Sequence, residues 1–130
     1  MNVIDLFAGC GGLSYGFKEA GFNSVGFLEI DKHCITTLKS NFKNNKTNDS
    51  SFLKYDIQNI FQKNHKSVEV SYFFDGINNI NVDGIIGGPP CQAYSLDGRA
   101  RDPGRMNYDY RNFLFESYIE WLKKIKPNFF

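Results

Sequence analysis

A cysteine directly behind two prolines is the feature of this sequence with the clearest potential for chemistry. Residues 87–95 read GGPPCQAYS, which places the cysteine at Cys91. Each proline fixes its own φ near about −65° and biases the residue before it toward extended conformations, so this backbone has few ways to relax. A free cysteine is usually a buried packing residue, whereas a cysteine held by a restricted backbone also fits a positioned nucleophile.

A glycine loop and an acidic residue form a second candidate site. The loop at 9–12 reads GCGG and follows an apolar run, and Glu29 ends the next apolar run. Such a pair could bind a dinucleotide, but the fingerprint G-x-G-x-x-G would need glycine where Ser14 stands. A glycine loop with a ribose-binding acid suits instead an uncharged nucleoside with a side chain, such as S-adenosylmethionine (AdoMet). The alternative interpretation is that the glycines form an ordinary turn and that Glu29 caps a helix.

Strand and helix signals alternate along the chain, which predicts parallel βαβ units with ligands at the carboxyl ends of the strands. Strands are expected at 2–7, 24–29, 52–55 and 82–87, with the start of a fifth at 128–130. Apolar spacing predicts three helices. The first carries Leu13, Phe17 and Ala20 and ends at Gly21. The second is capped by Asp31 and carries Cys34, Ile35, Leu38 and Phe42, and the third carries Leu114, Tyr118, Leu122 and Ile125 and ends at Pro127.

Other segments are harder to assign. The polar residues 39–51 predict a solvated helix end and loop or a basic surface, and a weak helix is expected after the third strand. Residues 67–81 are interpreted as an insertion. The polar segment 96–110 is too long for an ordinary connection, which favours a functional role or disorder. Cys34 is interpreted as a core residue and Cys10 as a turn position.

Composition narrows the class of protein. The 130 residues, 42% hydrophobic and 22% charged, predict one globular domain or a piece of one. With a net charge of +1, the chain as a whole has no strong positive potential that would attract a polyanion. A local basic face could still bind nucleic acid. Three cysteines and two histidines without paired spacing argue against a disulfide framework and a metal site. The amino terminus lacks a signal peptide and no run could span a membrane, so a cytoplasmic protein is expected.

Five short motifs together resemble a known family, the C5-cytosine-specific DNA methyltransferases, in order and spacing over essentially the whole chain. They are DLFAGCGG at 5–12, LEID at 28–31, YDI at 55–57, GGPPCQAYS at 87–95 and RNFLF at 111–115. The resemblance implies an α/β, Rossmann-like AdoMet-dependent methyltransferase fold, here incomplete, with a mainly parallel sheet and helices on both faces. It also implies that residues 1–130 form the amino-terminal part of the AdoMet-binding catalytic domain, ending before a Glu-Asn-Val motif and the target-recognition domain.

The resemblance also implies roles for individual residues. Cys91 would be the catalytic nucleophile, Gln92 and Ser95 would lie near the target strand, and Arg99 would reach a phosphate. For Ile30 and Leu114, an ordinary position in the hydrophobic core is an alternative of equal weight to a role in cofactor binding. The residues implied in AdoMet binding are Phe7, Gly9, Gly11 and Gly12 around the methionine portion, Glu29 at the ribose, Ile30, Asp56 and Ile57 at the adenine, and Pro90 and Leu114 in the same pocket.

The implied reaction is methyl transfer from AdoMet to C5 of a cytosine, leaving S-adenosylhomocysteine. A Cys91 thiolate would add to C6 of a cytosine flipped out of double-stranded DNA. The activity implied is that of a DNA (cytosine-5-)-methyltransferase from a bacterial restriction-modification system, with the chain alone expected to be inactive. A transfer RNA cytosine-5 methyltransferase and a non-catalytic AdoMet-binding half of a split enzyme are the alternatives. An open sheet edge could pair two copies into a dimer.

Overall fold

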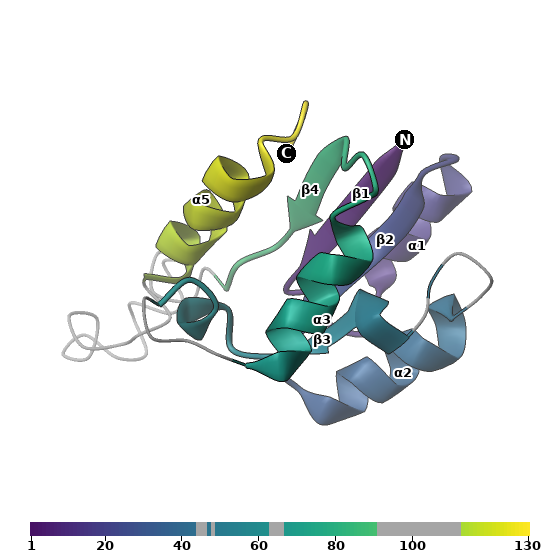
Figure 1. Ribbon diagram of the computed structural model, residues 1–130. Coiled ribbons are helices and arrows are strands. Elements are labelled where there is room, and N and C mark those ends of the chain that lie inside the picture. The colour runs from purple at the N-terminus through teal and green to yellow at the C-terminus, as the bar shows by residue number, and fades with distance from the viewer. Residues whose placement is uncertain (44–46, 48, 63–66, 91–112) are drawn as a thin grey trace, which may run out of the picture.

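The computed structural model describes residues 1–43, 47, 49–62, 67–90 and 113–130. Strands and helices alternate in this part of the chain, as Figure 1 shows. The strands are β1 (Asn2–Leu6), β2 (Asn23–Glu29), β3 (Phe52–Lys54) and β4 (Gly84–Gly87). The α-helices are α1 (Gly12–Glu19), α2 (Lys32–Phe42), α3 (Val68–Ile77) and α5 (Leu114–Ile125), and the short 3₁₀ turns are η1 (Asp49–Ser51) and η2 (Ile57–Asn59).

The four strands form one parallel sheet in the order β3-β2-β1-β4. Their apolar runs match this topology, because parallel strands are covered on both faces and have no solvent side to mark with polar residues. The four strands predicted from the sequence are confirmed: β1, β3 and β4 are one or two residues shorter than predicted, and β2 begins one residue earlier. β1 stops at Leu6 because Phe7 takes a left-handed φ of 60°, which cannot continue a strand.

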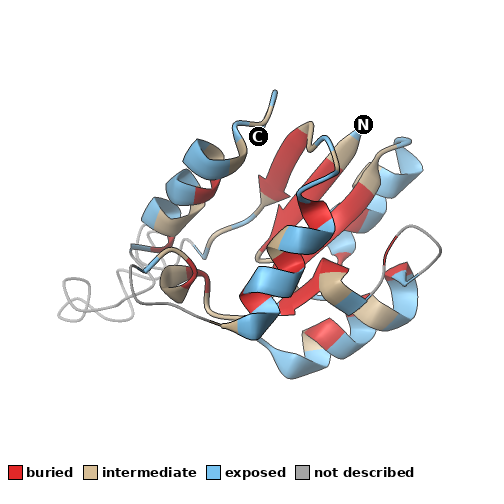
Figure 2. Cartoon of the chain, in the orientation of Figure 1, coloured by how far each residue is buried: buried red, intermediate tan, exposed pale blue. Residues whose placement is uncertain are grey.

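Helices cover both faces of the sheet, which confirms that part of the predicted architecture. On one face α2 buries its apolar side against the sheet, and α1 lies on the same face. The buried cluster there is Ala8, Phe27, Ile35, Leu38, Phe42 and Phe52. On the other face α3 and α5 cover a larger cluster that includes Ile4, Leu6, Leu28, Phe73, Ile85 and Trp121. Figure 2 shows the buried strands between these two exposed helix layers.

The interpretation of residues 67–81 as an insertion is wrong. The segment contains α3, which begins where the Ser67 hydroxyl accepts a hydrogen bond from the Val70 amide at 3.4 Å. Val70, Phe73 and Ile77 are buried on one face of this helix. Their spacing of three and four residues is the usual signal of an amphipathic helix. Among the described residues that follow β3 and precede residue 63, the expected weak helix is the single 3₁₀ turn η2.

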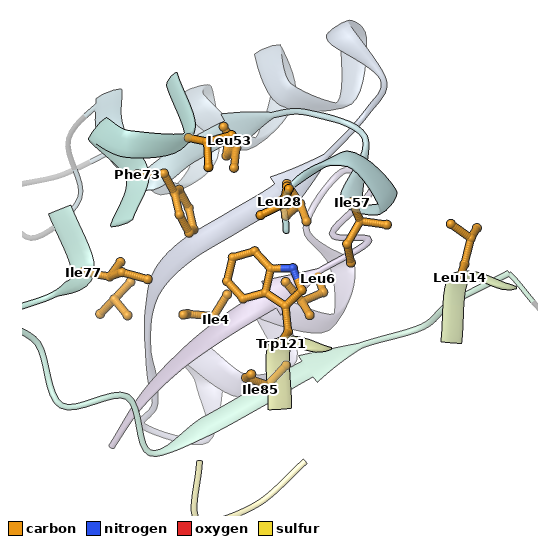
Figure 3. Packing of buried hydrophobic residues seen from close by; sticks show 13 residues of the cluster. Ile4, Leu6, Leu28, Leu53, Ile57, Phe73, Ile77, Ile85, Leu114 and Trp121 are labelled. Atoms are coloured by element: carbon orange, nitrogen blue, oxygen red, sulfur yellow. The ribbon is translucent and has the colours of Figure 1, made fainter. Parts of the chain in front are cut away.

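α5 is anchored to the sheet by a residue that the sequence analysis did not select. Trp121 is fully buried and stacks on Phe74, with ring centroids 5.3 Å apart. Figure 3 shows its indole ring among Ile4, Leu6 and Ile85. Because position 121 lies on the same helical face as the predicted positions 114, 118, 122 and 125, it belongs to the same apolar stripe.

The chain leaves α5 in the direction of the sheet. α5 ends at Ile125, Lys126 has a left-handed φ of 53°, and Pro127 follows. The carbonyl of Phe129 then accepts a hydrogen bond from the Ile85 amide at 3.2 Å, within a parallel bridge to Gly84. This bridge agrees with the predicted start of a fifth strand. Within the described ranges, no helix has the length and apolar character needed to cross a lipid bilayer.

Candidate functional site

A pocket of about 310 Å³ lies at the carboxyl ends of the strands. It includes the point where β1 is flanked by β2 on one side and β4 on the other, the place where open parallel sheets bind ligands. The pocket wall contains seven of the ten residues that were predicted to bind the cofactor, and these seven come from five separate segments. The lining residues are Phe7, Leu28, Glu29, Ile30, Tyr55, Asp56, Ile57, Gly88, Pro90 and Leu114.

Three lining residues were not among the predicted cofactor residues, although each lies inside one of the family motifs. Leu28 and Tyr55 immediately precede Glu29 and Asp56, and Gly88 lies two residues before Pro90. Their membership in these motifs, next to predicted site residues, was the available signal. It did not suffice, because which neighbours of a strand end face a pocket depends on where the next strand lies.

The glycine loop shapes the site without lining the pocket. Gly9, Gly11 and Gly12 are absent from the pocket wall, so the structure does not gather them with the other seven predicted residues. Gly11 has φ +91°, and a Cβ there would lie 2.5 Å from Cε2 of Phe42 and 2.8 Å from Cδ2 of Leu38. The loop therefore packs directly on α2, and only glycine combines this backbone conformation with so close an approach.

Glu29 connects the loop after β1 to the turn after β2. Its Oε2 accepts a hydrogen bond from the Gly9 amide at 2.8 Å, and its Oε1 accepts from the Ile30 and Asp31 amides, each at 2.9 Å. A carboxylate offers about four lone-pair positions, so these three bonds leave room for one further donor. The side chain is thus both a structural tie and an available acceptor at the pocket wall.

Apolar side chains and a second carboxylate complete the pocket. Asp56 accepts the Gln58 amide at 3.1 Å and so starts η2, which buries Ile57. Ile30 is 58% exposed, so the alternative that it is a core residue is wrong. Leu114 is 6% exposed and belongs both to the core cluster and to the pocket wall.

Asp5 is a buried acid that the sequence analysis did not single out. It is 1% exposed and accepts a hydrogen bond from the Ser14 hydroxyl at 2.6 Å, while its Oδ1 has no partner among the described residues. Burial, with a smaller contribution from the charge of Glu29, raises the pKa of Asp5 from 3.8 to about 6, against the lowering effect of the Ser14 hydrogen bond. Ser14, the residue that breaks the dinucleotide fingerprint, therefore holds this acid at the base of the glycine loop. A carboxylate inside an apolar strand was the available signal.

The chemistry of the pocket wall fits a nucleoside better than a dinucleotide. Its described lining residues include the carboxylates of Glu29 and Asp56 but no lysine, arginine or histidine. Bound phosphates normally need basic side chains or a helix amino terminus, whereas ribose hydroxyls donate well to carboxylates. Apolar groups such as Ile30 and Ile57 can cover the faces of a base. The residues present therefore fit AdoMet, whose net charge is not negative.

The predicted catalytic and nucleic-acid residues, Cys91, Gln92, Ser95 and Arg99, lie outside the described residues. Pro90, the residue immediately before Cys91 in the sequence, lines the pocket. Within the part of the chain that is described, no group of three or more histidine, cysteine, aspartate or glutamate side chains could hold a metal ion.

A parallel sheet with helices on both faces and a pocket at the carboxyl ends of its strands is a Rossmann-like α/β arrangement. The family described as C-5 cytosine-specific DNA methylase matches residues 1–130, and the chain belongs to that family. The sequence is 42% identical over 130 residues to the type II methyltransferase M.DdeI of Desulfomicrobium norvegicum, covering all of this chain and 26% of that protein. It is 38% identical over 130 residues to M.NgoPII of Neisseria gonorrhoeae, covering 32% of that protein.

A solved structure shares the fold. It is a prophage-encoded E. coli protein described as a DNA modification methyltransferase, with a TM-score of 0.68 and 34% sequence identity. The match covers 98% of this chain and 30% of that one. This chain thus spans about a quarter to a third of the length of these relatives.

Proposed function

We propose that this chain is the amino-terminal, cofactor-binding part of a DNA (cytosine-5-)-methyltransferase of a bacterial restriction-modification system, acting in the cytoplasm. The observation that carries the proposal is the pocket, in which seven residues implied by the family motifs meet at the carboxyl ends of the strands. Relatives of the chain are named type II methyltransferases, which supports the same substrate class. In this proposal a target-recognition domain and further catalytic residues lie beyond residue 130.

AdoMet is the proposed cofactor, and when bound it supplies a methyl group activated by a positively charged sulfur. Glu29 has one acceptor position left for a ribose hydroxyl. Ile30 packs on the adenine, and Asp56 and Ile57 contact the edge of the adenine. Phe7, Pro90 and Leu114 close the apolar wall, and the loop of Gly9, Gly11 and Gly12 faces the methionine portion.

Cys91 is the proposed nucleophile. Its thiolate adds to C6 of the cytosine, which breaks the aromaticity of the ring and makes C5 nucleophilic enough to take a methyl group. Loss of the C5 proton and of the Cys91 thiolate then restores the ring. A thiol suits this role because it ionises far more readily than a serine hydroxyl. The cytosine must leave the duplex first, at a cost of roughly a few kcal/mol, because C6 is inaccessible within the base stack.

Cofactor binding can be tested with two exposed isoleucines. Ile30 is 58% exposed in the pocket wall, and Ile119 is 41% exposed on α5. We expect Ile30→Ala to weaken AdoMet binding about tenfold in calorimetry, because it removes apolar area from the cofactor and none from the core. Ile119→Ala is the matched control and should bind as the parent does. Equal AdoMet affinity in the parent and Ile30→Ala, or no AdoMet binding by the parent, would contradict the proposed pocket.

Methyl transfer tests the nucleophile and the substrate. With the complete protein and radiolabelled AdoMet, Cys91→Ser is expected to abolish transfer to DNA and to keep AdoMet binding. Residual transfer at the parent rate would reject Cys91. Label appearing in transfer RNA in place of DNA would identify the related RNA enzyme. AdoMet binding without transfer to either, restored by a second subunit, would identify a split enzyme.

A further inference from the structure

Two thiols outside the proposed chemistry face each other across the glycine loop. Cys10 lies in that loop and Cys34 in the first turn of α2, and their Sγ atoms are 3.6 Å apart. Cys10 is exposed and Cys34 is half-buried. The interpretation of Cys34 as a core residue is therefore wrong. Ile35 and Leu38 are the α2 residues buried against the sheet, whereas the Cys34 sulfur lies against Cys10.

Backbone contacts hold the two thiol-bearing segments in place. On the α2 side, Oδ1 of Asp31 accepts from the Cys34 amide at 3.0 Å as part of the helix cap. On the loop side, the Gly9 amide donates to Glu29, which also accepts the Asp31 amide. One carboxylate therefore joins the residue before Cys10 to the cap of the helix that carries Cys34. The two sulfurs, 24 residues apart in the sequence, are brought together by this arrangement.

We propose that Cys10 and Cys34 form a redox modification site, in which a low-molecular-weight disulfide such as oxidised glutathione converts the two thiols into an intramolecular disulfide. A disulfide needs its sulfurs about 2.05 Å apart, which small side-chain rotations and loop adjustments can supply from a separation of 3.6 Å. The site goes beyond the proposed methyl transfer and does not depend on it, because it involves neither Cys91 nor AdoMet.

The reaction proceeds by two thiol–disulfide exchanges. The Cys10 thiolate attacks one sulfur of the external disulfide, whose S–S bond breaks and releases one small thiolate. Cys34 then loses its proton to solvent, and its sulfur attacks the Cys10 sulfur and releases the second small thiolate. The protein loses two thiol hydrogens, and the external disulfide is reduced to two thiols.

The local chemistry sets the order of these steps. The neighbouring Cys10 sulfur and, to a smaller extent, burial raise the pKa of Cys34 to about 11. Cys34 therefore remains protonated near neutral pH and is the poorer attacking group in the first exchange. Cys10 is also the more exposed of the two, so an external disulfide reaches it first.

Peptide mapping provides a direct test. The purified protein is incubated with oxidised glutathione, remaining thiols are alkylated, and trypsin is added. Cleavage after Lys18, Lys32 and Lys39 places Cys10 in peptide 1–18 and Cys34 in peptide 33–39. We expect these two peptides to be joined in the oxidised sample and separated by dithiothreitol. Separate peptides, each alkylated or carrying glutathione, would overturn the proposal, as would a link from either cysteine to Cys91.

Matched variants separate this pair from a nonspecific reaction. Cys10→Ser and Cys34→Ser should each lose the linked peptide, whereas Cys91→Ser should retain it. Closing a loop of this length is expected to raise the thermal midpoint by about 10 °C in the oxidised parent. The shift should be absent in Cys10→Ser under the same oxidant. An equal shift in parent and Cys10→Ser would also overturn the proposal, because it could not come from this bond.

Discussion

Asp5 is a case in which the surroundings of one residue determine its chemistry. The acid lies in an apolar strand and accepts a hydrogen bond from the Ser14 hydroxyl of α1. Desolvation of the charged form outweighs that hydrogen bond, so the pKa of Asp5 rises to about 6. A group whose pKa is higher in the folded state than in the unfolded state stabilises the fold at low pH and loses that contribution as the pH rises.

We therefore expect a specific pH profile for Asp5→Asn. The contribution of Asp5 to stability is fully present below pH 3.8, its unfolded pKa, and is lost as the pH rises through about 6. The difference between these two pKa values corresponds to about 3 kcal/mol. Urea denaturation at several pH values should show the free energy of unfolding of the parent falling, relative to Asp5→Asn, by up to about this amount between pH 4 and pH 7.

A surface acid supplies the control for this measurement. Asp49 is paired with Lys43 and Lys39, and hydrogen bonds with these two side chains lower its pKa. Its contribution is present above the unfolded pKa and lost as the pH falls, so the profile of Asp49→Asn should have the opposite sign. A difference between the parent and Asp5→Asn that is flat with pH would show that Asp5 is not held in a desolvated site.

At the scale of elements, α3 and α5 cover one face of the sheet through a cluster of aromatic rings. Trp121 of α5 stacks on Phe74 of α3, and its ring also meets Phe61 and Phe73 edge-on at 5.6 and 5.9 Å. These contacts connect two helices that are separated by 36 residues in the sequence. The indole nitrogen has no hydrogen-bond partner among the described residues, so the anchoring is by packing.

Trp121→Ala should therefore be strongly destabilising. Removing a fully buried aromatic ring leaves a large cavity, and we expect a loss of about 3–5 kcal/mol in the free energy of unfolding measured with urea. Ile119→Ala, two positions away on the outer side of α5, should cost less than about 1 kcal/mol. If the two variants lost similar stability, α5 would not be anchored through its tryptophan.

At the scale of the whole molecule, the pocket depends on the junction between β1 and β4. The chain crosses from one face of the sheet to the other before it returns as β4 beside β1. Gly87 ends β4 there with φ +155°, and a Cβ at this position would lie 2.1 Å from the carbonyl oxygen of Leu6. Gly87 therefore allows β4 to approach β1 closely, and the next residue, Gly88, forms part of the pocket wall.

Adjacent glycines offer a matched pair for testing this junction. Gly87→Ala must displace backbone, so we expect it to lower the free energy of unfolding by more than about 3 kcal/mol. Gly88→Ala meets open space and should remain within about 0.5 kcal/mol of the parent. Urea denaturation of both variants measures the difference, and failure of only Gly87→Ala to yield soluble protein would point the same way. Equal stability in the two variants would contradict the close approach.

The sequence alone predicted the local features of the fold and most of the pocket. Strands were recognisable because a parallel sheet buries both faces, which leaves continuous apolar runs. Asp31 was identified as a helix cap and does accept the His33 and Cys34 amides. The family motifs included seven pocket residues, because most of these motifs lie at the carboxyl end of a strand, where the pocket is.

Tertiary structure decided which distant residues meet. The pairing of Asp5 with Ser14 depends on how α1 packs on β1. The facing thiols of Cys10 and Cys34 and the position of α3 on the opposite face depend on how the strands are ordered and connected. Periodicity reports which side of an element is apolar, and it carries no information about which element covers that side. The sequence therefore determined the elements and the kind of ligand site they carry, whereas the buried acid and the thiol pair arise only when the loop after β1 packs against α1 and α2.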